Sequence, residues 1–305
     1  MKKFSLFLFA ALVTIILSAC SMESGTSKKD SASKEEGDFK IGFSVSTKNN
    51  PFFVTLSDSA EEQAKADGVS LTVVDAQDDA SKQTSDVEDL IQQGVDLLII
   101  NPVDSAAVSS AVESANSQGI PVITVDRSSD GGEVVSHIAS DNVAGGQLAG
   151  EYLLELVGEG AKVGMLEGVA GSSAARERGE GFLKAVEGKA DVVSKLTANF
   201  DRGEGLSVME NMLQSNPDIK AVFAQNDEMA LGALEAIQSS GKDIVVIGFD
   251  ATDDAVAKVQ EGKLAATVAQ KPDEIGKKAV ETAVKHLKGE TVEKSIPVEL
   301  ELIKK

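Results

Sequence analysis

The chain has 305 residues and a formal net charge of −20 at pH 7, from 29 Lys and Arg against 49 Asp and Glu. Its length favours two domains over one. An acidic surface without a Lys or Arg cluster repels phosphate backbones, which argues against a nucleic-acid partner. Cys20 is the single cysteine, which excludes a disulfide, a paired-cysteine metal site and a Cys/His nucleophile within the chain.

The first segment, "MKKFSLFLFAALVTIILSAC", has the layout of a secretory signal. Lys2 and Lys3 precede an apolar run at 4–17, which is shorter than the ~18 residues of a spanning helix. We therefore expect a signal peptide at residues 1–19. The tetrapeptide "LSAC" is similar to the lipobox of bacterial lipoproteins, and this similarity implies cleavage before Cys20 and its acylation with a palmitate-type lipid. The alternative is an incidental cysteine beside an ordinary cleavage site.

Residues 20–38 consist mainly of Ser, Lys, Glu, Asp and Gly, with almost nothing to bury. Such a composition predicts a disordered tether. With a lipid on Cys20, the tether would hold the folded part at the extracytoplasmic face of the cell membrane, as on a Gram-positive surface. The sequence thus predicts a protein that is anchored to a membrane and does not span it.

From residue 39 the chain alternates short apolar runs with longer amphipathic stretches. In the first half the pattern predicts strands at 40–46, 69–74, 96–100 and 121–125, with helices near 51–67, 80–93 and 104–117. Strands separated by helices predict right-handed βαβ units and a parallel sheet. Asn50 is expected to cap the first helix, with Pro51 at its first position, and Gly68 and Gly119 stand where helix ends need a positive φ.

The same order then recurs, and "IPVITVDR" in the first half is echoed by "IVVIGFDA" in the second. Here the predicted strands are 161–166, 190–197, 220–224 and 243–248, and the predicted helices lie near 174–187, 203–214 and 227–240. The pattern indicates two similar α/β units in tandem. A strand in "AATVAQ", a helix near 272–288 and a strand near 297–303 remain, and we expect them to be added to these two units.

In parallel sheets ligands bind outside the carboxyl ends of the strands. Residues near these ends are Ser46, Asn50, Phe52, Phe53, Asp126 and Arg127 in the first unit, and Phe200, Asn226 and Asp250 in the second. If the units face each other, these residues line one cleft. Carboxylates, amides and guanidinium groups hydrogen-bond to hydroxyls, and phenyl rings cover the C–H faces of a polyol. The sequence therefore predicts a cleft for a small, neutral, hydroxyl-rich ligand.

Five segments carry a family resemblance: "STKNNPFF", "GEVVSHIASDN", "SAARERGEGF", "VFAQNDEMALGAL" and "GKLAATVAQ". From about residue 40 to the C-terminus the chain resembles the ribose-binding branch of the bacterial periplasmic substrate-binding proteins, whose fold is shared with LacI-type regulators. The resemblance implies an α/β, type I periplasmic-binding-protein fold, with two doubly wound parallel-sheet domains joined by a multi-crossing hinge and a ligand cleft between them. It implies one domain of residues 39–140 plus 271–299 and another of 141–270 plus 300–305.

The sugar contacts of that family fall on residues of matching type in this chain: Ser46, Asn50, Phe52, Phe53, Asp126, Arg127, Arg178, Phe200, Asn226, Asp250 and Gln270. The resemblance implies that Phe52 and Phe53 pack on the sugar ring, with Phe200 opposite. It also implies the substrate-binding lipoprotein of an ABC importer, which binds D-ribose or a close pentose and delivers it to a membrane permease. A chemotaxis receptor is a candidate second partner. We expect a monomer with no cofactor and no bound metal.

Several of these residues also have ordinary structural interpretations. Phe53 begins a helical apolar stripe and fits a core position. Asp126 and Asp250 fit turn positions. Asn226 and Asp227 both fit helix caps, and Asp227 is the one we expect to cap. Arg176 fits a solvated helix face, and both histidines fit structural or surface roles.

The competing function is a sugar-converting enzyme of the same architecture, in which Asp126 and Asp250 form an acid/base pair. Arg127 and Arg178 are expected to keep both carboxylates charged, which disfavours that chemistry. "EGVAGSSA" lacks a phosphate-loop pattern, and "DAQDD" and "ATDDA" lack the spacing of a calcium loop. A DNA-binding regulator is excluded because a signal peptide stands where its DNA-binding domain would be.

Overall fold

The computed structural model describes residues 39–305. The predicted signal peptide, Cys20 and the predicted tether lie outside the described residues. None of the helices in 39–305 is long and apolar enough to cross a lipid bilayer.

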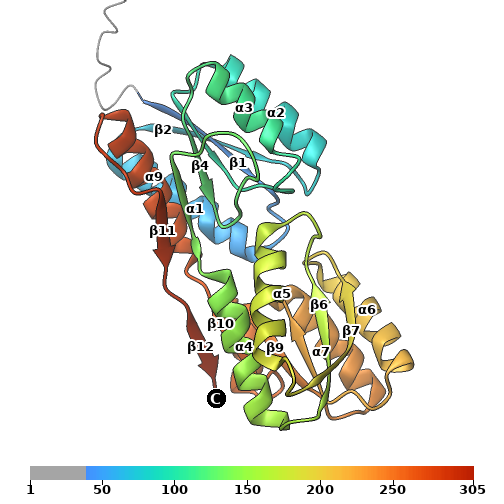
Figure 1. The fold of residues 1–305 in the computed structure, drawn as a ribbon. Coiled ribbons are helices and arrows are strands. Elements are labelled where there is room, and N and C mark those ends of the chain that lie inside the picture. Colours follow the sequence, from blue (N-terminus) through green and yellow to red (C-terminus); the bar gives the residue numbers. More distant parts are fainter. Residues whose placement is uncertain (1–38) are drawn as a thin grey trace, which may run out of the picture. The chain divides into compact units, whose positions relative to one another are not determined.

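The first sheet has six parallel strands in the order β11-β5-β4-β3-β1-β2 (Figure 1). They are β1 (Lys40–Val45), β2 (Ser70–Asp75), β3 (Leu97–Ile100), β4 (Val122–Val125), β5 (Ser136–Ser140) and β11 (Ser295–Val298). The helices α1 (Pro51–Asp67) and α9 (Pro272–Leu287) cover one face, and α2 (Ala80–Gln92) and α3 (Ser109–Ser117) cover the other. Both faces are apolar, as expected of a parallel sheet buried on both sides.

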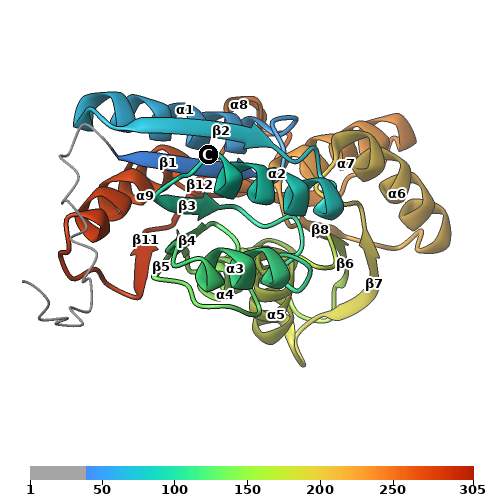
Figure 2. The same cartoon turned by 90° about the horizontal axis from the view of Figure 1, so that it is seen from above.

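The second sheet also has six strands, in the order β12-β10-β9-β8-β6-β7. They are β6 (Lys162–Glu167), β7 (Asp191–Thr197), β8 (Ala221–Ala224), β9 (Val245–Asp250), β10 (Ala266–Ala269) and β12 (Glu301–Lys304). The helices α4 (Asn142–Val157) and α5 (Ser173–Val186) pack on one face, and α6 (Arg202–Ser215), α7 (Asp227–Ser240) and α8 (Asp253–Gln260) belong to the other (Figure 2). The predicted α/β fold with two parallel-sheet units is confirmed, with one departure: the edge strand β12 pairs antiparallel with β10.

The chain passes between the sheets three times. It leaves the first sheet after β5, returns after β10 to form α9 and β11, and crosses again before β12. The single strand predicted near 297–303 is therefore wrong, because this stretch forms two strands that belong to different sheets.

The ends of α1 follow the expected local signals. Asn50 caps the helix by accepting a hydrogen bond of 2.9 Å from the backbone N–H of Phe52, and Pro51 occupies the first position. Gly68 ends the helix at φ 70°. This cap fixes the direction in which the chain leaves β1, so it sets where Phe52 and Phe53 lie.

Three elements were not predicted, namely β5, α4 and α8, and α3 begins at Ser109 rather than near 104. The sequence of α4 contains glycines at 145, 146 and 150, which are poor helix formers. They are tolerated because α4 packs closely on α5: a Cβ at Gly146 would collide with the carbonyl oxygen of Arg178. Tertiary packing thus overrides propensity at this helix.

Candidate ligand-binding site

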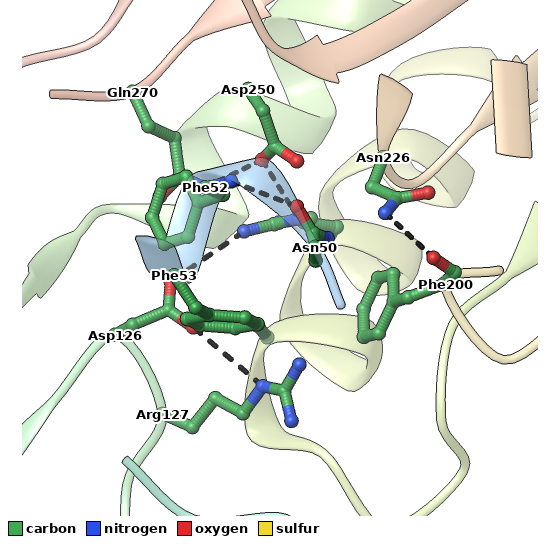
Figure 3. A pocket seen from close by; sticks show the side chains of 11 residues that line it. Asn50, Phe52, Phe53, Asp126, Arg127, Phe200, Asn226, Asp250 and Gln270 are labelled. Carbon is green, nitrogen blue, oxygen red and sulfur yellow. Dashed lines mark hydrogen bonds and ion pairs between the residues drawn. The ribbon is translucent and has the colours of Figure 1, made fainter. Parts of the chain in front are cut away.

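A pocket of about 230 Å³ lies where the carboxyl ends of strands from both sheets meet (Figure 3). It is lined by Asn50, Phe52, Phe53, Asp126, Arg127, Ala174, Arg178, Phe200, Asn226, Asp250 and Gln270. The structure therefore gathers ten of the eleven predicted contact residues around one pocket.

Ser46 is the exception, because it does not belong to the lining. It is fully buried at the end of β1, and its backbone N–H donates to Asn101 Oδ1 over 3.2 Å. Ala174, at the start of α5, lines the pocket and was not predicted. An alanine carries no polar or aromatic signal that would mark it as a contact.

The aromatic residues form two walls. Phe52 and Phe53 meet edge to face, with ring centroids 5.1 Å apart and planes at 89°. The guanidinium carbon of Arg127 lies 5.0 Å from the centroid of the Phe53 ring and 5.2 Å from that of Phe200. Both interpretations of Phe53 hold, since it is buried in the core of the first sheet and also lines the pocket.

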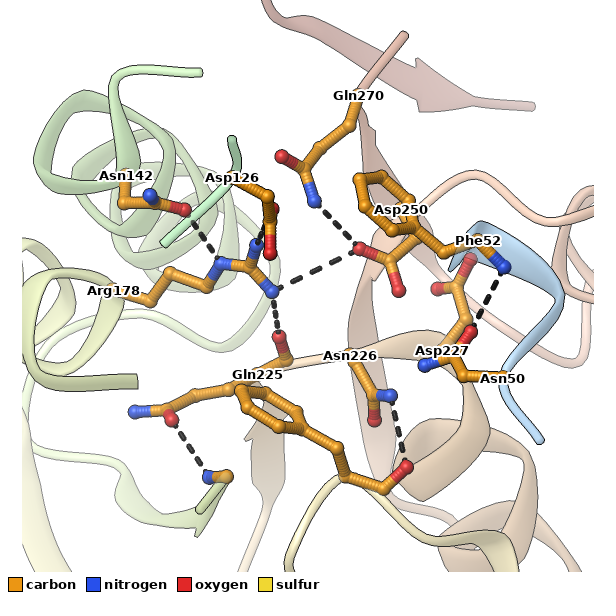
Figure 4. A network of polar contacts seen from close by, with 12 residues as sticks. Asn50, Phe52, Asp126, Asn142, Arg178, Gln225, Asn226, Asp227, Asp250 and Gln270 are labelled. Carbon is orange, nitrogen blue, oxygen red and sulfur yellow. Dashed lines mark hydrogen bonds and ion pairs between the residues drawn. The ribbon is translucent and has the colours of Figure 1, made fainter. Parts of the chain in front are cut away.

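Hydrogen bonds hold the guanidinium group of Arg178 in place (Figure 4). Its Nε donates to Asn142 Oδ1 over 2.8 Å, and its Nη1 donates to the backbone carbonyl of Gln225 over 2.7 Å. The guanidinium carbon also lies 3.9 Å from the centroid of the Phe249 ring. These contacts fix the planar group, whose Nη2 has no hydrogen bond among the described contacts.

Two carboxylates lie near this guanidinium at distances too long for hydrogen bonds. Arg178 Nη2 is 3.9 Å from Asp126 Oδ1, and Arg178 Nη1 is 3.8 Å from Asp250 Oδ1. Asp250 Oδ1 instead accepts a bond of 2.8 Å from the side-chain amide of Gln270. The arrangement brings donors and acceptors together without pairing all of them.

Burial has different consequences for two charged groups of the pocket. It raises the pKa of Asp250 well above its ordinary value, with the nearby Arg178 acting in the opposite direction. We expected the neighbouring arginines to keep the Asp250 carboxylate charged, and this expectation is wrong. The effect of desolvation on its pKa exceeds that of the attraction to Arg178 across 3.8 Å. Burial also lowers the pKa of Arg127, whose Nη1 donates to the carbonyl of Pro102 over 3.1 Å.

Asn226 has two roles at the start of α7. Its Oδ1 caps the helix by accepting from the backbone N–H of Met229 over 3.0 Å, and its Nδ2 donates to the carbonyl of Phe200 over 3.1 Å. The expectation that Asp227 caps this helix is wrong. Asp227 is the first helical residue, and its side chain points to the loop after β9 instead.

Three polar atoms of the lining are buried without a hydrogen-bond partner among residues 39–305: Asp126 Oδ1, Arg127 Nε and Gln270 Oε1. Leaving such an atom unpaired costs about 1–3 kcal/mol. The set contains both acceptors and a donor, so a ligand that satisfies all three must itself donate and accept. Hydroxyl groups do both.

The backbone is strained at three lining residues. Asp126 has φ 60°, Phe200 has φ 61° and Asp250 has φ 121°, a region that non-glycine residues avoid. Such conformations cost on the order of 1–3 kcal/mol each and persist only where surrounding contacts hold them. Their concentration in one pocket is typical of a functional site.

A layer of buried side chains supports the lining, and the sequence analysis missed it. Asn101 donates to the carbonyl of Val125 over 3.1 Å and lies 3.4 Å from Asp126 Oδ2. Asn142 and Gln225 hold Arg178 from the other side. Asn101 directly follows β3 and Gln225 directly follows β8. The position of residues at the carboxyl ends of strands, which pointed to most of the lining, could therefore also have pointed to these two.

Contacts beyond the pocket also join residues of the two sheets. Ser173 accepts from the backbone N–H of Ser128 over 2.9 Å and donates its own N–H to Ser105 Oγ over 3.2 Å. Arg176 is half-exposed, as expected, but pairs with Asp130 over 3.0 Å. These residues form a seam beside the pocket.

The described part of the chain contains no group of three or more His, Cys, Asp or Glu side chains that could hold a metal ion. The side chains that line the pocket offer hydrogen bonds, charges and aromatic faces. This suits recognition of a polar ligand.

Comparisons with known proteins agree with this geometry. The periplasmic binding protein domain family matches residues 41–291. The ribose import binding protein of Bacillus subtilis is 57% identical over 291 residues, covering 95% of each chain. The corresponding protein of Escherichia coli is 52% identical, covering 97% of this chain and 98% of its own. Among solved structures, an ABC transporter solute binding protein from Mycobacterium smegmatis with bound glycerol superposes with a TM-score of 0.84 at 38% identity, covering 88% of this chain and 94% of that one.

Proposed function

Because the chain belongs to the periplasmic binding protein family, we propose that it is the ribose-binding component of an ABC importer. In this function it binds D-ribose, or a close pentose, in the pocket between the two sheets and delivers the sugar to a membrane permease. The relatives from Bacillus subtilis and Escherichia coli are both named as ribose import binding proteins.

The observation that carries the proposal is the set of unpaired buried atoms on Asp126, Arg127 and Gln270. A pentose presents several hydroxyls within a small volume, and each can donate one hydrogen bond and accept others. Phe53 and Phe200 offer apolar faces to the C–H groups of the ring. A ligand with fewer hydroxyls would leave some of these atoms unsatisfied.

Binding between two units gives delivery a physical basis. Asn50, Asp126 and Arg127 belong to the first unit, whereas Arg178 and Asn226 belong to the second. A sugar that contacts both units binds the closed arrangement better than an open one, and only this differential affinity can shift the equilibrium between them. Closure would then present the permease with a surface that the open form lacks.

An enzyme that converts the sugar is the second candidate, because the raised pKa of Asp250 is a property of general acids. We favour binding over catalysis. Asp250 is held by Gln270 and faces Arg178, both of which suit hydrogen bonding to a stationary hydroxyl. Incubation with ribose followed by NMR of the sugar separates the two, since an enzyme would generate a new product.

We further propose that the protein is a monomer, that Cys20 carries a lipid, and that the folded part is held at the extracytoplasmic face of the cell membrane. The "LSAC" segment and the composition of residues 20–38 support the lipid on Cys20 and the location at the membrane. A chemotaxis receptor is a candidate second partner.

A calorimetric titration against pentoses and hexoses tests the proposed ligand. We expect ribose to bind and glucose and galactose not to, because the added hydroxymethyl group must fit between Phe53 and Phe200, which both line the pocket. A protein that binds glucose as tightly as ribose, or that does not bind ribose, would contradict the proposal.

A further inference from the structure

We infer that Asp227 is a positioning residue of the pocket, which holds the loop after β9 so that Asp250 faces the ligand. The inference rests on the proposed function, since it gives Asp227 a role in sugar binding that it performs through another residue. Asp227 is fully buried and is absent from the pocket lining. Figure 4 shows it close to Asp250 and Asn226.

The loop that Asp227 contacts has an unusual backbone. β9 ends at Asp250 with φ 121°, and Ala251 follows with φ 57°. Two successive non-glycine residues in this region require contacts that hold them. The direction of the Asp250 side chain depends on this backbone, because φ and ψ fix where the Cα–Cβ bond points.

The carboxylate of Asp227 supplies those contacts. Its Oδ2 accepts from the backbone N–H of Thr252 over 2.8 Å and from the Thr252 hydroxyl over 3.2 Å. Its Oδ1 accepts from the hydroxyl of Thr267 over 2.7 Å. Thr267 in turn accepts from the backbone N–H of Ala251 over 3.1 Å. Both amides that follow Asp250 are therefore bonded to Asp227, directly or through one hydroxyl.

The donor and acceptor roles of the groups in these hydrogen bonds are fixed. The Thr267 hydroxyl has one proton, which it gives to Asp227, so it can only accept from Ala251. Thr252 is the N-cap of α8, yet its side chain makes no capping bond to that helix and donates to Asp227 instead. The side chain of Thr252 thus ties the loop to the start of α7 rather than to the helix that follows it.

Packing around the carboxylate agrees with a fixed position. A Cβ on Gly248 in β9 would collide with Asp227 Oδ1. Only glycine at this position lets the carboxylate approach the strand that carries Asp250. Asp227 has no ion pair among the described contacts, so its place is set by hydrogen bonds from neutral donors.

Two near-isosteric substitutions test the inference. In Asp227→Asn one acceptor oxygen becomes an NH2 group, which cannot accept from a donor. In Thr267→Val the hydroxyl between Asp227 and Ala251 is lost. We expect each to raise the Kd for ribose by about tenfold, because a buried hydrogen bond that holds the loop is removed. Thr282→Val, which removes a buried hydroxyl in α9, is the matched control and should leave the Kd unchanged.

A second measurement distinguishes positioning from general stability. Combined with Asp250→Asn, Asp227→Asn should raise the Kd by less than the product of the two separate effects, since both act through one carboxylate. In the sugar-free protein, the amide protons of Ala251 and Thr252 should exchange with solvent faster in Asp227→Asn than in the unaltered protein.

Failure of the positioning role and failure of the proposed function give different results. Unchanged exchange at these two amides, or fully multiplicative effects on the Kd, would overturn the positioning role. If the unaltered protein fails to bind ribose, the proposed function fails, and amide exchange alone then decides whether Asp227 holds the loop.

Discussion

Arg178 Nη2 lies 3.9 Å from Asp126 Oδ1, although the two residues belong to units built on different sheets. At this distance the charges attract, but they do not share a hydrogen bond. Both side chains are almost fully buried, so the interaction is little screened by solvent. A hydroxyl between them would bond to both, and we propose that a sugar joins the two units at this pair.

The first prediction concerns this joint attachment. Asp126→Asn and Asn226→Ser should each weaken ribose binding by roughly 1–3 kcal/mol, because each leaves a buried hydroxyl or donor without its partner. Serine retains an oxygen that can cap α7, so the loss at Asn226 reports on the ligand rather than on the helix. Calorimetry measures both.

Asp79→Ala is the control for these two substitutions. Asp79 caps α2 by accepting from the backbone N–H groups of Ser81 and Lys82, and it does not line the pocket. Its removal should lower stability by about 1 kcal/mol without changing affinity. A site confined to one unit would respond to only one of the two pocket substitutions.

Most of the pocket could be predicted because its residues stand near strand ends, where the chain must turn and where parallel sheets place their ligands. Arg178 lies within α5 instead, and only the family resemblance pointed to it. Ser46 shows the limit of that rule. It directly follows β1, as Asp126 directly follows β4, but Asp126 adopts φ 60° and Ser46 does not have a positive φ. The backbone conformation decides which side chain reaches the pocket, and residue type alone does not reveal it.

Elements that depend on distant partners were harder to predict. β5, "SHIAS", is short and polar, and it is stabilised by pairing with β4 and with β11, which lies more than 150 residues later. The raised pKa of Asp250 is a similar case, because it depends on burial and on a 3.8 Å separation that the sequence does not encode locally. Long-range contacts override local pattern in both.

The lipid anchor leads to a prediction that does not depend on the pocket. Cys20→Ala should release the protein from the membrane fraction or leave its signal peptide uncut, since the cysteine is the proposed acylation site. Fractionation and intact-mass measurement report on both. Lys28→Ala, in the same polar segment, should leave processing unchanged. If Cys20→Ala is processed and held in the membrane fraction just as the protein without the substitution is, the proposed lipid anchor is wrong.

The seam beside the pocket should contribute to affinity without touching the sugar. Ser173→Ala removes the acceptor for the backbone N–H of Ser128, a bond that joins residues of different units. We expect ribose affinity to fall by about 0.5–1.5 kcal/mol, because the closed arrangement loses a hydrogen bond. Ser207→Ala in α6, whose hydroxyl bonds within its own helix, is the control. Equal Kd values for the two variants would show that the seam does not bias closure.

Gly168 controls the position of Phe200. A Cβ at Gly168 would overlap the Phe200 ring, so Gly168→Ala should push this ring out of place and raise the Kd several-fold, consistent with the ~0.5–1.5 kcal/mol of an aromatic contact. In Gly203→Ala the nearest atom, Asp201 Oδ1, lies 3.3 Å from the added Cβ, and α6 should accept it. Titration of both variants with ribose separates the loss of an aromatic wall from a general effect of replacing glycine.

The last prediction follows from the electrostatics of Asp227. Burial raises its pKa from an ordinary 3.8 to about 7, against the opposing effect of hydrogen bonds from Thr267 and Thr252. Between these two values the folded protein holds a proton that the unfolded chain has released. The contribution of Asp227 to the free energy of unfolding is therefore greatest below pH 3.8 and is lost as the pH rises towards about 7. The pKa of Asp250 shifts in the same direction, chiefly through burial and with a further contribution from the nearby Asp227.

Asp227→Asn should accordingly reduce the fall in melting temperature between about pH 5 and about pH 8, because the asparagine has no proton to lose. Asp58→Asn, which alters an exposed carboxylate on α1, should leave the pH dependence as it is in the unaltered protein. Differential scanning calorimetry of the three sugar-free proteins across this range gives the comparison. Parallel curves for Asp227→Asn and the unaltered protein would mean that this buried carboxylate stays charged throughout, held by its hydrogen-bond donors alone.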